Sequence, residues 1–554
     1  MKHKVSLIVL LMVSSLTLWA GNLQKVVGLS DSVYDKMDEL YVSSGLALPS
    51  TTRPWNKDEV QFLLSRIDAG SLDSGSRLLY DSIASLIDDD PFCFIMTVSL
   101  SPEFYLHTNP SSFGSSDDWY LTYEKRAPFA SMKFDFSLTD HFYGFLQFPE
   151  YRVNKTESDG SQPGFSTVFA SNFNWLHNSS STLTTDFPVR GFGAFGGKGW
   201  FAQVGREQLS WGPSESGNFL IDSHLLYHNM FRLSAYGKVM KYTFLTSFFS
   251  SPAEIKADDG LLGPIKMFMA HRFEWRIWDK VGIALTEGIM YQPQNNVLDL
   301  RILNPFGFYH NYYIINEANS IAQLELDYTP FSHWNFYGSW AVDEIRFLWT
   351  EKADSANVHP DGMGFLLGTK CAYPESHGVW KGSFEWTYTT PYFYLRSVDP
   401  DKNQTDDYDN LNYIVATRRW VNGKLTYDQN FMGSPYGGDA IVFQLAGEYA
   451  SHASWEAGAR LLYVVHGEKT KNGTSSYWKV GPDAYGEHTP TGGWNTATRS
   501  LMLGLSGSKS WGNNWKVYGE MDVFRIANKG HVEGNTQWDV QWNLGFLFQI
   551  STPK

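Results

Sequence analysis

Two stretches of the chain combine aromatic rings with charged or planar polar groups, which is the combination that binds carbohydrate. Aromatic faces stack on the apolar faces of sugar rings, and the polar groups hydrogen-bond to the hydroxyls. The first stretch is 204–218, where Gly-Arg-Glu leads to Trp-Gly-Pro, and the second is 301–313. The candidate glycan-binding residues are Arg206, Glu207, Trp211, Arg301, Tyr309, His310 and Asn311.

Polar side chains also recur at every second position along several segments whose other positions are apolar. Successive side chains of a strand point to opposite faces, so each such segment has one apolar and one charged face. If these strands close into a barrel, the charged faces line the lumen. The residues predicted to line it are Gln323, Glu325, Asp327, Glu448, Arg460, Glu520 and Asp522.

The spacing that covalent or metal chemistry requires is missing. The sequence has no HExxH, GxSxG or phosphate-loop motif and no CxxC pair. A barrel hydrolase would have to use a histidine such as His107, His141, His333 or His466, and a lone histidine at a strand end is more often an interface residue. We predict no enzyme, no catalytic residue, no metal site and no cofactor. The formal net charge of -14 argues against nucleic acid as a partner.

The chain begins like an exported protein. Lys2 and Lys4 precede an apolar run, 5–18, and the small Ala20 offers a cleavage point, which predicts a signal peptide over residues 1–20. No later stretch has the roughly 18 consecutive apolar residues that a membrane helix needs. The chain is nevertheless 16 % aromatic at a mean hydropathy of -0.30, which favours strands that alternate in polarity.

The final segment has the most regular alternation. Even positions are apolar from Trp538 to Ile550, and most odd positions are polar. Outer-membrane barrels close their sheet on a strand of this kind and usually end on Phe, whereas here 549–554 follow Phe548. We predict that residues 91–554 form an all-β transmembrane barrel of about 18 antiparallel strands. The final strand is expected to be recognised by the barrel-insertion machinery.

The connections between these segments alternate in length. Tight turns are predicted near 139–140, 196–198, 236–238, 278–280, 329–333, 422–423, 451–454 and 511–514, with longer polar connections such as 211–228 between them. Bacterial barrels have short periplasmic turns and longer external loops. The alternation predicts a protein of the bacterial outer membrane, surrounded by outer-membrane lipid, with both mature termini in the periplasm.

Residues 21–90 follow a different period. Apolar side chains recur at helical spacing in 33–41, 60–67 and 79–87, and Asn56 with Glu59 marks a helix start. Three short helices bury little core alone. We therefore predict a periplasmic helical region over residues 21–90 that packs into the mouth of the barrel as a plug.

The stretch from Val204 to Asn218 resembles the capsule assembly Wzi family of outer-membrane proteins, in which a strand ending in Gly-Arg and Trp-Gly opens an external loop. The layout is similar as well, although sequence similarity is concentrated in 201–235. The resemblance implies an 18-stranded barrel, plugged from the periplasmic side, that binds surface or capsular polysaccharide and aids its assembly or attachment. Only Arg206, Trp211 and Gly212 match the family's pattern one by one.

Two other interpretations stay open. The first is a porin or substrate channel for small solutes or sugars, with the polar ladder lining an open lumen. The second is that the candidate glycan-binding residues have a structural role and contact no ligand. The aromatics of 301–313 would then form an interface girdle or pack inside the lumen, and Arg206 with Glu207 would belong to the lumenal ladder.

Overall fold

The computed structural model describes residues 22–87, 94–112, 127–152, 169–172, 183–184, 190–250, 265–291, 304, 307, 309, 318–345, 361–395, 411–421, 424–469 and 487–552. The predicted signal peptide, 1–20, lies outside them. No helix among the described residues is long and apolar enough to cross a membrane.

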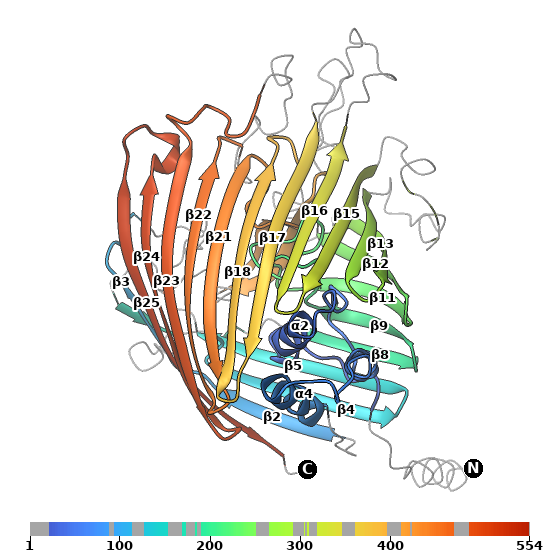
Figure 1. Cartoon of the computed structure of the whole chain (residues 1–554). Helices are drawn as coiled ribbons and strands as arrows, with labels where there is room; N and C mark the ends of the chain where they lie inside the picture. Colours follow the sequence, from blue (N-terminus) through green and yellow to red (C-terminus); the bar gives the residue numbers. More distant parts are fainter. Residues whose placement is uncertain are drawn as a thin grey trace, which may run out of the picture.

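The wall of the molecule is one closed sheet of 18 antiparallel strands (Figure 1), which confirms the predicted fold class. Each strand pairs with its neighbours in the wall, and the last one, β25, closes the ring on β2 and β3. Two short strands add to the sheet: β6 (Phe169–Ser171) pairs with β3, and β7 (Leu183–Thr184) pairs with β5. In hydrogen-bonded order the wall is β2 (Phe94–Leu100) with β3 (Glu103–His107), β4 (Ala130–Thr139), β5 (Phe142–Arg152), β8 (Arg190–Gly197), β9 (Trp200–Glu207), β11 (His228–Tyr236), β12 (Met240–Ser250), β13 (Ile265–Ile277), β14 (Val281–Tyr291), β15 (Ala318–Phe331), β16 (Trp334–Glu344), β17 (Gly362–Pro374), β18 (Gly378–Thr389), β21 (Ala440–Ser451), β22 (Trp455–His466), β23 (Thr498–Trp511), β24 (Trp515–Ala527) and β25 (Gln537–Ser551).

The outer face of the wall is apolar. On β23, Leu501, Leu503 and Leu505 point outward and are 37 %, 46 % and 44 % exposed, while Met502 between them is buried inside. Water would penalise such a surface, whereas hydrocarbon chains accept it. The alternation that the sequence shows therefore places an apolar surface against lipid and polar groups inside.

The two rims of the barrel differ, as the alternation of connection lengths predicts. Tight turns such as 198–199, 332–333 and 452–454 join strands at one rim, which we call the short-turn end, and longer connections lie at the other, the long-loop end. The predicted turn at 422–423 is flanked by two strands that do not belong to the wall. It lies outside the described residues, between β19 (Ile414–Val421) and β20 (Lys424–Phe431), which pair with each other. The corresponding wall turn is instead 375–377, between β17 and β18.

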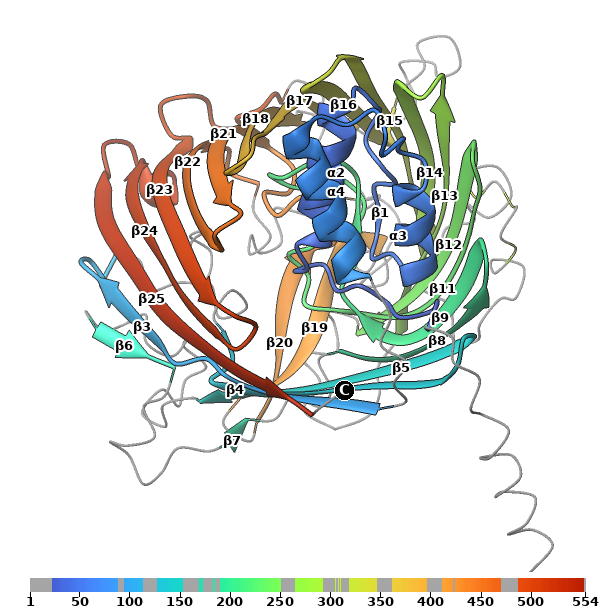
Figure 2. The same ribbon diagram turned by 60° about the horizontal axis from the view of Figure 1, so that its bottom comes forward.

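The helical region lies at the short-turn end and reaches into the barrel (Figure 2). It contains α2 (Val33–Ser43), α3 (Lys57–Leu64) and α4 (Ser74–Leu86), which share one apolar core. The predicted helix start is confirmed, because the Asn56 side chain caps α3 by accepting from Glu59 N–H at 2.9 Å. Main-chain bonds from the short turns reach this region, including Gly199 N–H to the Asp58 carboxylate at 2.8 Å.

Candidate functional site

A buried carboxylate on the inner wall holds the helical region in place. Glu274 of β13 is 3 % exposed. It accepts hydrogen bonds from the hydroxyls of Ser50 at 2.7 Å, Thr51 at 3.1 Å and Thr52 at 3.0 Å. It also accepts from Thr51 N–H at 3.1 Å. A buried carboxylate is tolerated only when partners replace its water, so the segment 50–52 and the wall stabilise each other.

Three residues predicted to line the lumen, Gln323, Glu325 and Asp327, extend this network on β15. Glu325 forms a bidentate pair with Arg272 at 2.7 and 2.8 Å, and Gln323 donates to Glu325 at 2.9 Å. Asp327 accepts from Leu48 N–H at 2.7 Å. All three side chains point inward and are buried. They bind protein groups here and do not face an open passage.

The connection 208–227 folds into the lumen, so the prediction that 211–228 is an external loop is wrong. Its strand β10 (Ser210–Trp211) pairs with β1 (Thr52–Arg53) of the helical region. Trp211 is 0 % exposed and belongs to the lumenal apolar core. Burial of its apolar ring stabilises this inward fold, and its faces are not available for stacking on a sugar.

A second buried carboxylate anchors the inward loop. Glu385 of β18 is 1 % exposed and accepts from Ser214 Oγ at 3.0 Å and from the N–H groups of Glu215 at 2.8 Å and Ser216 at 2.7 Å. Tyr337 donates its hydroxyl to the same carboxylate at 2.6 Å. Glu274 and Glu385 thus hold two segments that are joined to each other by the β1–β10 pair.

The hairpin β19–β20 also packs inside the barrel (Figure 2). Tyr413 just before it donates to the main-chain oxygen of Asn319 at 2.9 Å, and Lys266 on the inner face of β13 donates to that of Ile414 at 2.7 Å. Phe431 at its other end joins the same core as Trp211. One side of the lumen is therefore filled by protein from three separate parts of the chain.

The remaining candidate glycan residues are spread out. Glu207 is buried and pairs with Arg190 at 2.5 and 2.7 Å. Arg206 points outward at the long-loop end, where it stacks over Tyr227 at 4.0 Å. Tyr309 is 0 % exposed and stacks on His271 at 5.0 Å. Three candidates lie outside the described residues: Arg301, His310 and Asn311. The structure does not bring the described candidates together into one site.

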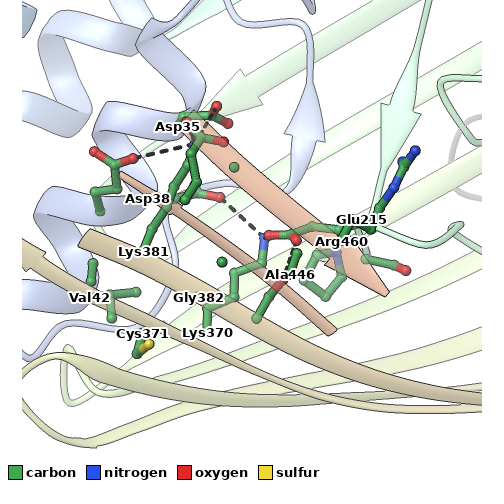
Figure 3. Close-up of a pocket in the computed structure, with 18 of the residues that line it drawn as sticks. Asp35, Asp38, Val42, Glu215, Lys370, Cys371, Lys381, Gly382, Ala446 and Arg460 are labelled. Atoms are coloured by element: carbon green, nitrogen blue, oxygen red, sulfur yellow. Dashed lines mark hydrogen bonds and ion pairs between the residues drawn. The ribbon is translucent and has the colours of Figure 1, made fainter. Parts of the chain in front are cut away.

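A charged cavity of about 490 Å³ lies between helix α2 and the inner face of β17, β18 and β21–β24 (Figure 3). Small inward side chains on the wall, including Ala446, Gly458 and Gly504, leave this space open. Three of the predicted lumen-lining residues border it, namely Glu448, Arg460 and Glu520, while Asp522 is buried one step further along β24.

An apolar layer lies between this cavity and the long-loop end on four of these strands, β21–β24. Val442, Leu462, Met502 and Phe524 point inward and form a buried cluster. On each strand they lie nearer to the long-loop end than the residues that line the cavity. A polar solute crossing here would have to leave water for this apolar layer.

Basic side chains in the cavity are shared between several carboxylates. Lys381 Nζ lies 3.1 Å from Glu448, 3.2 Å from Asp35 and 3.8 Å from Glu39 (Figure 3). Lys370 Nζ lies 3.4 Å from Glu215 and 3.6 Å from Asp38, which also pairs with Arg53 at 2.6 Å. Since Asp35, Asp38 and Glu39 come from α2, these pairs dock the helix on the wall.

Asp35 and Glu39 of α2 both lie beside Lys381 of β18, but their carboxyl pKa values shift in opposite directions. Burial raises the pKa of Glu39 to about 8, because the neighbouring Lys381 only partly offsets the loss of water. Burial also acts on Asp35, but there the closer Lys381 outweighs it and lowers the pKa of the carboxyl. Glu39 is therefore the α2 carboxyl that takes up a proton near neutral pH.

We predict that the helical region docks more tightly at pH 6 than at pH 9. Released, Glu39 has a pKa of about 4.3, so between that value and about 8 the docked state binds the extra proton. Docking weakens as pH rises through this window, and Glu39→Gln removes that dependence. The measurement is the rate of limited proteolysis of 22–87 against pH. Equal protection of the wild type at both values contradicts the assignment.

An exposed tryptophan stands on a rigid connection at the long-loop end. Among the large apolar side chains described in the connections at this end, Trp494 and Val532 are exposed, at 56 % and 58 %. The segment carrying Trp494 is well held. Thr491 N–H donates to Asp439 at 3.0 Å, and Asn528 Nδ2 donates to the Asn495 carbonyl at 2.9 Å. Such a ring is presented with little conformational entropy left to lose on binding.

A carboxylate packs against the turn that precedes Trp494. Gly492 and Gly493 have φ of +72° and +82°, which favour glycine. A Cβ added at Gly492 would collide with the Glu468 carboxylate, so the carboxylate packs directly against this glycine. An exposed aromatic face and a carboxylate are the two kinds of group that contact a sugar ring. Neither Trp494 nor Glu468 was predicted from the sequence, although the Gly-Gly-Trp signal was available.

The comparisons bear on the fold. No family model and no curated protein matches the sequence. Among solved structures, the chain superposes on Escherichia coli Wzi, described as an outer-membrane protein involved in group 1 capsule assembly and a carbohydrate-binding β-barrel. The TM-score is 0.59 at 12 % identity, with 95 % of this chain and 99 % of Wzi covered.

Two porin-type structures were also matched. Pseudomonas aeruginosa OccD3 (OpdP) gives a TM-score of 0.40 at 8 % identity, covering 83 % of this chain and 92 % of the other. Acinetobacter baumannii OccAB4 gives 0.39 at 7 %, covering 83 % and 99 %. The closed sheet and the match to Wzi together show that the protein has the fold of an outer-membrane β-barrel with the 18-strand architecture of Wzi.

Proposed function

We propose that this chain is an outer-membrane protein that binds a surface or capsular polysaccharide at its long-loop end, aids its assembly or attachment, and keeps its lumen closed. The observation that carries the proposal is the joined pair of lumenal segments, 50–52 and 208–227, each anchored by a buried carboxylate. A barrel built for free diffusion has no need of this filling. The likeness in fold to carbohydrate-binding Wzi supports the choice of ligand.

The proposal includes an orientation and a site. The long-loop end faces the cell exterior and both mature termini lie in the periplasm, as the short turns of bacterial barrels do. Trp494 and Glu468 form the glycan contact. The final strand β25 engages the barrel-insertion machinery, and the chain catalyses no reaction.

We expect Trp494→Ala to weaken polysaccharide binding by about 10- to 100-fold, since covering a large exposed apolar ring stabilises a complex by roughly 1.5–3 kcal/mol. Full-length protein in detergent is applied to an array of bacterial capsular and surface polysaccharides, and the best ligand is titrated against both variants. Trp278→Ala is the matched control, because Trp278 is 87 % exposed on a short turn at the opposite end. Lack of binding by the wild type to every polysaccharide contradicts the function, whereas equal binding by Trp494→Ala moves the site elsewhere.

A channel for small solutes is the second candidate, and the charged cavity favours it. Arg460 and Glu520 there have side chains that are 40 % and 33 % exposed, so part of the lumen is hydrated. Passage would require the apolar layer of Val442, Leu462 and Met502 to open. Single-channel recording of the full-length protein separates the candidates, because steady conductance would favour the channel.

A further inference from the structure

The outer wall carries two arginines where its apolar band ends. Arg499 of β23 and Arg525 of β24 point outward, because side chains alternate along a strand and Met502, three residues after Arg499, and Phe524, next to Arg525, lie inside the barrel. Leu501 pairs directly with Arg525, and Arg499 pairs with Ala527, so the two arginines are diagonal neighbours on adjacent strands. Both lie on the long-loop side of Leu503 and Leu505.

Neither guanidinium has a hydrogen-bond or carboxylate partner in the part of the chain that the structure describes. The Nε of Arg499 is buried without a partner. Arg525 lies over the ring of Trp538 on β25, 5.8 Å from its centroid, and the two residues pair across the strands. Inside the barrel, Arg53, Arg190 and Arg272 each pair with a carboxylate, and the buried Arg232 donates to the Gln203 amide at 2.7 Å.

Charged side chains on the lipid face are costly near the middle of a bilayer and tolerated near its surface. Tryptophan prefers the same level, where its ring is apolar and its N–H is hydrated. Trp538 is 57 % exposed on the outer face, so it marks the interface beside the arginines. At this level the groups available to an unpaired guanidinium are the headgroups of lipids.

We propose that Arg499 and Arg525 form a binding site for the phosphate of a lipid headgroup in the leaflet at the long-loop end. A guanidinium matches phosphate with two parallel N–H···O bonds. Two of them on neighbouring strands hold a single phosphate from both sides. The hydrocarbon chains of the same lipid then lie along Leu501, Leu503 and Leu505, which are exposed on the outer face of β23 toward the short-turn end.

The test compares three probes on the full-length protein in detergent. Native mass spectrometry follows binding of diphosphoryl lipid A, of the same lipid after removal of its phosphates, and of inorganic phosphate. The variants are Arg499→Gln with Arg525→Gln, and Arg499→Lys with Arg525→Lys. The matched control is Lys238→Gln with Lys280→Gln, which removes two exposed basic groups from the short turns. Heat-modifiable mobility shows that each variant is folded.

The glutamine pair is expected to bind diphosphoryl lipid A at least about tenfold more weakly than the wild type. The lysine pair should bind with intermediate affinity, because it keeps the positive charges but cannot form the two parallel N–H···O bonds of a guanidinium. The control pair should bind like the wild type. Equal binding by the glutamine pair would overturn the proposal, as would equal wild-type binding of the dephosphorylated lipid. Displacement of the lipid by inorganic phosphate would overturn the assignment to a headgroup.

Discussion

We expect that deleting residues 22–87 converts a silent barrel into a conducting one. Barrels with 16–18 strands leave an aqueous channel when nothing fills them, and this wall has 18. The deletion removes α2, α3 and α4 and the segment 48–52 that Glu274 and Asp327 bind. It also removes β1, the partner of β10, so the loop 208–227 loses its lumenal contact with Thr52 and Arg53. Planar-bilayer recording of both proteins measures the change.

The comparison needs a folded variant and a control for loosened packing. Heat-modifiable mobility on gels reports that the wall has formed. Arg66→Gln is the control, because it breaks the exposed pair of Arg66 with Asp279, whose side chain is 68 % exposed, and leaves the helical region in place. Silence of the folded deletion variant would mean that the loop 208–227 and the hairpin β19–β20 suffice to close the lumen. Steady conductance of the wild type would contradict the closed lumen itself.

Glu274→Ala is expected to have the largest effect of any single substitution considered, weakening docking of the helical region by about 3 kcal/mol or more. Three hydroxyls and one N–H group of 50–52 lose their acceptor in a site with little water. Arg272 loses its 3.2 Å pair with Glu274 but keeps its bidentate pair with Glu325, so most of the lost bonds are those to the helical region. Urea titration with limited proteolysis between 46 and 54 measures it.

Two variants make this result specific. Glu274→Gln keeps the shape and one acceptor oxygen, so it should fall between alanine and the wild type. Arg66→Gln removes an exposed pair at the same junction, and such pairs contribute at most about 1 kcal/mol. A Glu274→Ala protein that resists protease like the wild type would show that the apolar core around Val379 and α2, not the carboxylate, holds the region.

The local parts of the fold could be predicted because they depend on side chains that are close in sequence. A period of two separates the exposed Leu503 from the buried Met502, and a helical period groups Val60 with Leu63 and Leu64 in one core. The Asn56 cap joins residues three apart. Connection lengths likewise distinguish the two rims, since a two-residue turn and a long loop differ in the sequence itself.

The site could not be predicted in the same way. Trp211 looks like an exposed loop residue, and only its pairing with Thr52 places it in the lumenal core. Glu274 and Glu385 look like ordinary members of alternating strands. Their partners Thr51 and Ser216 lie 223 and 169 residues away in the sequence. A local periodicity of side chains cannot predict contacts between residues that far apart.

The sequence by itself determined the class of antiparallel barrel, the apolar outer face and the three helices, because periodicity follows from backbone geometry that every residue shares. The count of 18 strands was implied by the family resemblance and is shown by the structure. Only the tertiary structure decided which inward polar side chains bind the segments inside the lumen and which, like Arg460, stay partly exposed to water. It also decided that 208–227 folds inward and that Trp494 stays exposed. The reason is that satisfying a buried charge depends on groups brought together by closure of the whole sheet.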